Sequence, residues 1–214
     1  MKNFFQELRP LRFRLLAAFL PALILIAAAL ADTRAQAQSV QQELSGSILR
    51  FHVLANSDSP EDQAVKLKVR DAVLEALQPA LSEVSTKEEA MQAAAENEEL
   101  ILKTAAEVLA ENGVDQPVSM ALENCWFPAK TYGELCFPPG YYDALRIQIG
   151  NAQGHNWWCV MYPALCFTDM TGGVLGPESE DQLHGVLSDD TYNSMKPVKF
   201  RFRFLTFLNR FLEN

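Results

Sequence analysis

Positive charge and cysteine are both scarce in this sequence. Its 18 Lys and Arg residues stand against 27 Asp and Glu residues, which gives a formal net charge of −9 at pH 7. A general anionic field repels phosphate backbones, so the charge argues against nucleic acid as a partner. Four cysteines are too few for a small scaffold built on disulfides. With 49% hydrophobic residues over 214 positions, a disordered or collagen-like chain is excluded, and one packed domain with a short appendage fits the length.

Sequence signatures of common catalytic and metal sites are also missing. The chain has no Cys-x-x-Cys pair and no nucleophile elbow, metal-binding helix motif or phosphate-binding loop. We therefore expect no metal, no cofactor and no catalytic residue.

The N-terminus carries an export signal. Basic residues precede an uncharged apolar run, Leu15 to Ala31, which ends in the small-x-small pattern Ala29-Leu30-Ala31. A basic stretch, an apolar stretch and a small-residue exit are typical of a secretory signal peptide, cleaved here before Asp32. The alternative is an uncleaved N-terminal anchor, because the run is at the lower limit for a spanning helix. Residues 1–31 are thus a signal peptide or an anchor, and the polar residues 32–47 are expected to be a linker.

The next part of the chain predicts a strand and two helices. Residues 48–55 are mostly apolar, β-branched and aromatic, as in a strand. Ser59 followed by Pro60 is a helix start, and Pro79 ends that helix. A second helix is expected from Ser85 to Asn112, where Gly113 supplies a stop.

Beyond Pro117 the pattern changes from helix to strand. Residues 118–127, 144–149 and 157–162 are expected to be strands that pair antiparallel through short loops. Residues 168–190 suggest a long surface excursion, Ser188 could cap a short helix through Met195, and residues 198–214 predict a strand and then a helix. The expectation is one α+β domain over residues 48–214: an N-terminal strand and two helices, an antiparallel sheet, and a C-terminal strand and helix.

The four cysteines favour structural bridges, because the chain is expected outside the cytoplasm. Cys159 and Cys166 lie close together around a Tyr-Pro turn, and Cys125 and Cys136 flank a turn from two strands. Both pairs are therefore disulfide candidates. The alternative is a nucleophilic cysteine paired with a histidine, and the candidates for that base are His52, His155 and His184.

Two short segments are candidates for binding. Asn56, Ser57 and Asp58 form a polar loop between the first strand and its helix, where turn and cap formation is the simplest role and acid–base chemistry with His52 is the alternative. Asn156, Trp157 and Trp158 place two tryptophans on opposite faces of one strand. Both tryptophans can be core, or one can be an exposed interface anchor.

Three stretches of the chain resemble the stage II sporulation protein R family. They are ILRFHVLANSDSPEDQAVKLKVRDAVL (48–74), FPAKTYGELCFPPGYYDALRIQIGNAQGHNWWCVMYPALCF (127–167) and the basic-aromatic VKFRFRF (198–204). Cys125 and Cys136 are not part of the family pattern, so a bridge between them would be a local addition.

The resemblance implies a signalling role in endospore formation. Such a protein is exported into the space between forespore and mother cell, where it activates a membrane-embedded aspartic protease that processes the pro-form of the mother-cell sigma-E factor. The chain would then be a ligand and not an enzyme, with membrane contact through its N-terminal segment. We expect the contact with the protease to include Asn56, Ser57, Asp58 and the segment Asn156, Trp157 and Trp158.

Two other functions remain as alternatives. One is a secreted hydrolase that uses His52 and Asp58. The other is a module that binds the membrane surface through its basic, phenylalanine-rich C-terminal tail, whose polar stripe is basic as in interfacial helices.

Overall fold

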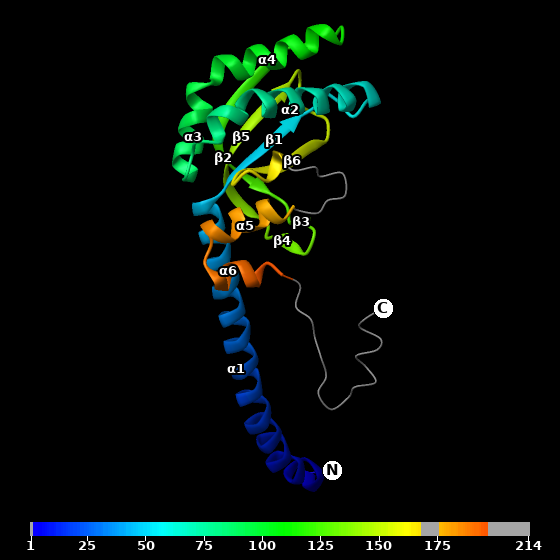
Figure 1. Cartoon of the computed structure of the whole chain (residues 1–214). Coiled ribbons are helices and arrows are strands. Elements are labelled where there is room, and N and C mark those ends of the chain that lie inside the picture. Colours follow the sequence, from blue (N-terminus) through cyan, green and yellow to red (C-terminus); the bar gives the residue numbers. More distant parts are fainter. Residues whose placement is uncertain (1, 168–175, 197–214) are drawn as a thin grey trace, which may run out of the picture. The chain divides into compact units, whose positions relative to one another are not determined.

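The chain divides into two compact units, residues 1–42 and residues 43–214. A computed structural model describes residues 2–167 and 176–196 (Figure 1). The C-terminal strand and helix expected at residues 198–214 lie outside the described residues.

The first unit is formed by helix α1 (Lys2–Ser47), whose last residues belong to the second unit. From Phe19 onward α1 is long and apolar enough to cross a membrane, a property that signal sequences share. The linker expected at residues 32–47 is helical in the structure. Alanine, glutamine and glutamate are good helix formers, and this stretch has no proline to end the helix.

The second unit is built on a four-stranded mixed sheet with the order β2-β5-β1-β6 (Figure 1). Its strands are β1 (Leu49–Leu54), β2 (Val118–Phe127), β5 (Gly140–Ile149) and β6 (Asn156–Tyr162). The α+β class is confirmed, but the sheet is not wholly antiparallel as expected. Strand β1 lies between β5 and β6 and runs parallel to β5. The strands β5 and β6, which follow each other in the sequence, therefore do not pair with each other.

Three helices cover one face of this sheet: α2 (Pro60–Leu81), α3 (Lys87–Glu96) and α4 (Glu98–Glu111) (Figure 1). The core forms between them and the odd-numbered side chains of β1, including Phe51 and Val53, which are fully buried. Ser59 caps α2 as expected, since its hydroxyl accepts from the Asp62 N–H at 3.1 Å. The helix continues two residues past Pro79 before it ends.

The single helix expected over residues 85–112 is two helices. The first helix begins at Lys87, two residues later than expected, because Thr86 is its N-cap: the Thr86 hydroxyl accepts from the Glu89 N–H at 3.2 Å. It breaks at Asn97, whose side-chain amide donates to the Ala93 carbonyl oxygen at 2.8 Å. An asparagine that bonds to the preceding turn in this way competes with the regular backbone ladder.

The last described part of the chain is helical as well. The surface excursion expected at residues 168–190 contains helix α5 (Pro177–Val186), and residues 168–175 lie outside the described part. Ser188 caps the short helix α6 (Asp189–Ser194), as its position predicts. The carboxylate of Glu43 accepts from the Ser188 and Thr191 hydroxyls at 2.9 and 2.6 Å, so the start of the second unit is tied to the start of α6.

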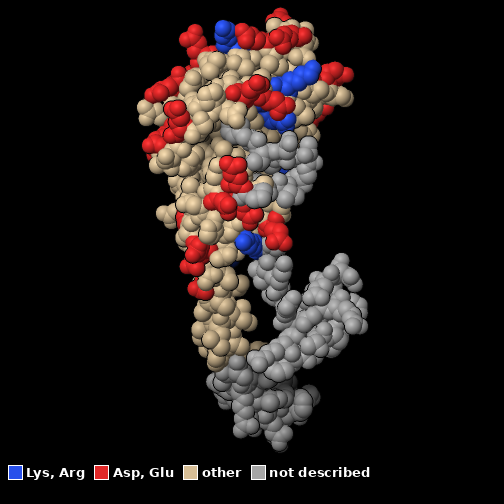
Figure 2. All heavy atoms as spheres, viewed as in Figure 1, with Lys and Arg blue, Asp and Glu red and all other residues tan. Residues whose placement is uncertain are grey.

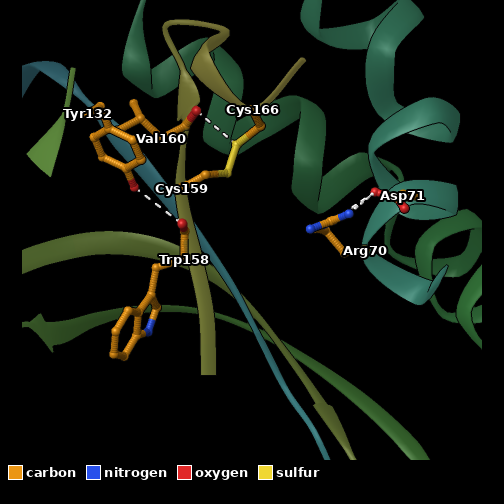
Figure 3. The surroundings of a disulfide bond; sticks show 7 residues. All are labelled: Arg70, Asp71, Tyr132, Trp158, Cys159, Val160 and Cys166. Atoms are coloured by element: carbon orange, nitrogen blue, oxygen red, sulfur yellow. Dashed lines mark hydrogen bonds and ion pairs between the residues drawn. A yellow bond between two sulfur atoms is a disulfide. The ribbon is translucent and has the colours of Figure 1, made fainter. Parts of the chain in front are cut away.

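A disulfide joins Cys159 of β6 to Cys166 in the short 3-10 helix η1 (Leu165–Phe167) (Figure 3). The sequence separation of seven fits the turn between them. The expected disulfide between Cys125 and Cys136 is wrong, because both cysteines are free. Cys125 pairs in register with Tyr142 of the main sheet, whereas Cys136 lies in the separate ribbon of β3 (Lys130–Tyr132) and β4 (Leu135–Phe137), opposite Thr131.

The two leucines of α2 at positions 77 and 67 test where the core lies. Leu77 is fully buried and Leu67 is 38% exposed. We expect Leu77→Ala to lower the free energy of unfolding by about 2–5 kcal/mol, because it leaves a cavity between helix and sheet. Leu67→Ala on the same helix is the matched control and should cost less than about 1 kcal/mol. Equal losses in urea unfolding of the two variants would contradict this packing.

Candidate functional site

The Asn56–Asp58 loop lies against the turn that precedes β6. The Asn56 side-chain oxygen accepts from the Asn151 N–H at 3.0 Å, and Asp58 accepts from the His155 N–H at 2.6 Å. The Asp58 carboxylate also contacts Nδ1 of His155 at 2.5 Å. The structure therefore brings together the two segments that the sequence singled out, because Leu54 at the end of β1 pairs with Asn156 at the start of β6.

Close backbone packing requires glycine on the β6 side of this contact. A Cβ atom on Gly154 would lie 2.2 Å from the Ser57 carbonyl oxygen. Gly150 has a φ of +57°, and a Cβ there would lie 2.3 Å from the Asn56 side-chain oxygen. These two positions lock the loop and the turn into one rigid unit.

Hydrogen bonds within this unit satisfy its polar groups. Asp62 accepts from the side chains of Asn56 and Ser57, and the buried ammonium of Lys66 donates to the His155 carbonyl oxygen at 2.8 Å. The hydrogen bonds from the His155 backbone and ring lower the pKa of Asp58. A carboxylate held in its ionised form in this way is a structural anchor and a poor general acid, so turn and cap formation accounts for these residues.

The two adjacent tryptophans are half-buried and have different surroundings. Trp157 faces the helices, where its ring packs edge-on to Phe51 at 6.1 Å and beneath the Arg70 guanidinium at 4.6 Å. Trp158 points away from the Cys159–Cys166 disulfide toward the opposite face (Figure 3). Its register partner there is His52. Trp157 therefore belongs to the core side, and Trp158 is the tryptophan of the pair on the face that the helices leave uncovered.

One half of that second face is closed by the β3–β4 ribbon over a buried arginine. Arg50 is 1% exposed, and its guanidinium lies 4.6 to 5.6 Å from the ring centroids of Phe127, Phe137 and Tyr142. Cation–π attraction in this aromatic box offsets part of the cost of burying the charge. The ribbon is anchored by the Tyr132 hydroxyl, which donates to the Trp158 carbonyl oxygen at 3.2 Å (Figure 3).

The other half of this face carries mostly polar side chains, and we call it the open sheet face. It is formed by alternate residues of the four strands: Ala121, Glu123, Cys125, His52, Arg146, Gln148, Asn156 and Trp158. Its buried polar atoms include His52 Nδ1 and the Asn156 side-chain oxygen, neither of which has a hydrogen-bond partner among the described residues.

Three of these side chains converge on one point. The donor atoms of His52, Glu123 and Cys125 lie within 4.8 Å of one another, and the Cys125 Sγ is 3.7 Å from the His52 Nε2. Sequence reasoning named His52 as one of three candidate bases for a nucleophilic cysteine, without choosing the cysteine, and it missed Glu123. The sequence did contain a sign of this cluster, because Glu123 and Cys125 are two residues apart on a strand and therefore point to the same face.

Cys125 and His52 are close enough for the alternative in which a nucleophilic cysteine is activated by a histidine base. The protonation states of the two groups oppose this alternative. Burial, followed by the positive charges of Arg146 and Arg50, lowers the pKa of His52 to about 4. Burial and the negative charge of Glu123 raise the pKa of the Cys125 thiol. A weak base next to a protonated thiol is the reverse of an activated pair, which needs a thiolate beside an imidazolium.

Other exposed features lie away from these residues. Trp126 and Tyr141 are cross-strand partners, 55% and 61% exposed, and sequence reasoning did not single them out. A cavity of about 660 Å³ lies between the end of α2, the turn after β6 and α5. Glu178 is the charged residue among its described lining residues, so this cavity has no catalytic cluster. Acidic side chains are spread over the visible surface and basic ones are few (Figure 2).

The depressed pKa of His52 predicts how stability depends on pH. Between about pH 6.5 and pH 4 the unfolded chain binds a proton at this histidine and the folded chain does not, so stability falls as the pH is lowered. The loss at pH 4 is up to about 3 kcal/mol. His52→Gln should flatten this part of the stability curve, measured by urea unfolding with EDTA present. Parallel curves for both proteins would contradict the buried, neutral imidazole.

Comparison with known proteins gives a consistent result. The family model of stage II sporulation protein R (spore_II_R) matches residues 45–172. Stage II sporulation protein R of Bacillus subtilis (strain 168) is 33% identical over 181 residues, which is 82% of this chain and 81% of the relative. No solved structure matches the chain. The residues that the family model matches include β1, the helices α2 to α4, the open sheet face, and the Asn56–Asp58 loop with the turn before β6. The chain therefore belongs to the stage II sporulation protein R family, and this relationship supports a role in sporulation.

Proposed function

We propose that this protein is an exported signalling protein of endospore formation that activates a membrane-embedded aspartic protease. That protease removes the pro-sequence of the mother-cell sigma-E factor. The observation that carries the proposal is family membership over most of the chain. The apolar N-terminal helix supports export from the forespore, as a signal peptide or as an anchor.

Activation without chemistry on the protease requires a surface that binds one of its states better than the other. The open sheet face is the surface that best fits this need. The helices α2 to α4 do not cover this face. It presents Trp158 and Asn156 beside the unit formed by the Asn56–Asp58 loop and the turn before β6. A preformed surface of this kind loses little conformational entropy on binding.

The charge states of His52 and Asp58 favour recognition over hydrolysis. Asp58 is anchored by His155, and His52 is neutral through burial. The hydrolase alternative needs these two residues as an acid–base pair, and Asp58 is engaged with His155 on the loop. The membrane-surface alternative rests on residues 198–214, outside the described part of the chain.

Reconstitution in a non-sporulating host tests the proposed function. The full chain is expressed with the membrane protease and the pro-sigma factor, and removal of the pro-sequence is followed by gel shift. We expect cleavage that requires both this chain and its N-terminal segment. Absence of cleavage with a folded, exported chain, and with a protease that its own cognate activator does switch on, would overturn the role.

The contribution of the open sheet face is tested in the same system by two tryptophan variants. Trp158→Ala should slow pro-sequence removal about 30-fold, as expected when a central aromatic anchor worth about 2 kcal/mol is lost. Trp126→Ala is the matched control, because Trp126 is 55% exposed but lies on the other face of the sheet. Near-UV circular dichroism and export must be unchanged in both variants. An equal effect of the two substitutions would remove this face from the interface.

A further inference from the structure

The point where His52, Glu123 and Cys125 meet has the geometry of a metal site. His52 comes from β1, and Glu123 and Cys125 come from β2, with β5 lying between the two strands. Ala144 of β5 is the register partner of both Arg50 and Glu123. Its small side chain leaves room for longer groups from the two flanking strands, β1 and β2, to meet above it.

The distances fit a tetrahedral zinc ion. With Zn–S near 2.3 Å and Zn–N near 2.0–2.1 Å, two ligands of one tetrahedron lie about 3.6 Å apart. The Cys125 Sγ and His52 Nε2 are 3.7 Å apart, and the three donor atoms all lie within 4.8 Å of one another. A carboxylate oxygen of Glu123, within the same range, would supply the third corner.

The charges and the outer contacts also suit this ion. A thiolate and a carboxylate balance the two charges of zinc, and the imidazole is neutral. The Arg146 Nη1 holds one Glu123 oxygen at 2.7 Å, which leaves the second oxygen for the metal and fixes the orientation of the carboxylate. The His52 Nδ1 has no acceptor among the described residues, which predicts an affinity below that of sites with a complete outer shell.

We propose that His52, Glu123 and Cys125 form a zinc site on the open sheet face, with its fourth position open. On binding, the Cys125 S–H bond breaks, its electron pair forms the sulfur–zinc bond, and the proton goes to solvent. Both Cys125 and Glu123 are half-buried, so the ion can enter from solvent and a fourth ligand can reach it. The metal would tie β1 to β2 across β5. This proposal is independent of the proposed function.

The second free cysteine provides a matched control. Cys136 is exposed and lies in the separate β3–β4 ribbon, so Cys136→Ser leaves Cys125 as the single free thiol while the Cys159–Cys166 disulfide is kept. The full-length protein in detergent, carrying Cys136→Ser, is titrated anaerobically with Co²⁺ as a spectroscopic substitute for zinc. We expect one equivalent to give a thiolate-to-cobalt charge-transfer absorption, and Zn²⁺ to displace the cobalt.

Two further variants in the Cys136→Ser background decide the outcome. Cys125→Ser should abolish the absorption and weaken zinc binding in isothermal titration calorimetry by more than about 100-fold, beyond what loss of an outer-shell contact costs. Glu123→Gln should retain the sulfur band with weaker zinc binding, and near-UV circular dichroism shows that each variant is folded. Absence of the charge-transfer band in the folded Cys136→Ser protein would overturn the proposal. Zinc binding unchanged by Cys125→Ser would also overturn it.

Discussion

The structure depends on a constraint set by β1, a strand held between two neighbours with both of its faces buried. Five of its six residues are buried, although they include an arginine and a histidine. Phe51 and Val53 point to the helices and build the core. Arg50 and His52 must therefore be accommodated on the second face, since adjacent side chains of a strand alternate. The rest of that face is arranged around these two groups.

The two buried polar side chains are accommodated by different means. Arg50 is enclosed by three aromatic rings from β2, β4 and β5, which explains why the small β3–β4 ribbon folds over this end of the sheet. His52 is kept neutral and lies beside a thiol and a carboxylate. The first environment is closed and apolar, and the second is half-open and polar. The open sheet face is the second of these environments, and it is where we place the proposed contact with the protease.

The loop unit at the other end of β1 connects local sequence to this surface. Asn56 and Asp58 accept hydrogen bonds from the turn before β6, and the two glycines of that turn permit the close approach. The contact fixes how β6 enters the sheet and hence the direction of Trp158. In the proposed function, residues that form turns and caps thus contribute indirectly, by holding Trp158 in position on its strand.

Local structure could be predicted from the residues alone: a strand that contains 49–54, the helix caps Ser59 and Ser188, the α+β class and the family. These depend on hydrophobic period, cap chemistry and motifs, which are short-range properties. The fold had to be known to place β1 between β5 and β6, Cys125 next to His52 and not Cys136, and Trp158 on the open sheet face. Strand order and cross-strand contacts join residues far apart in the chain, and no local pattern encodes such pairs.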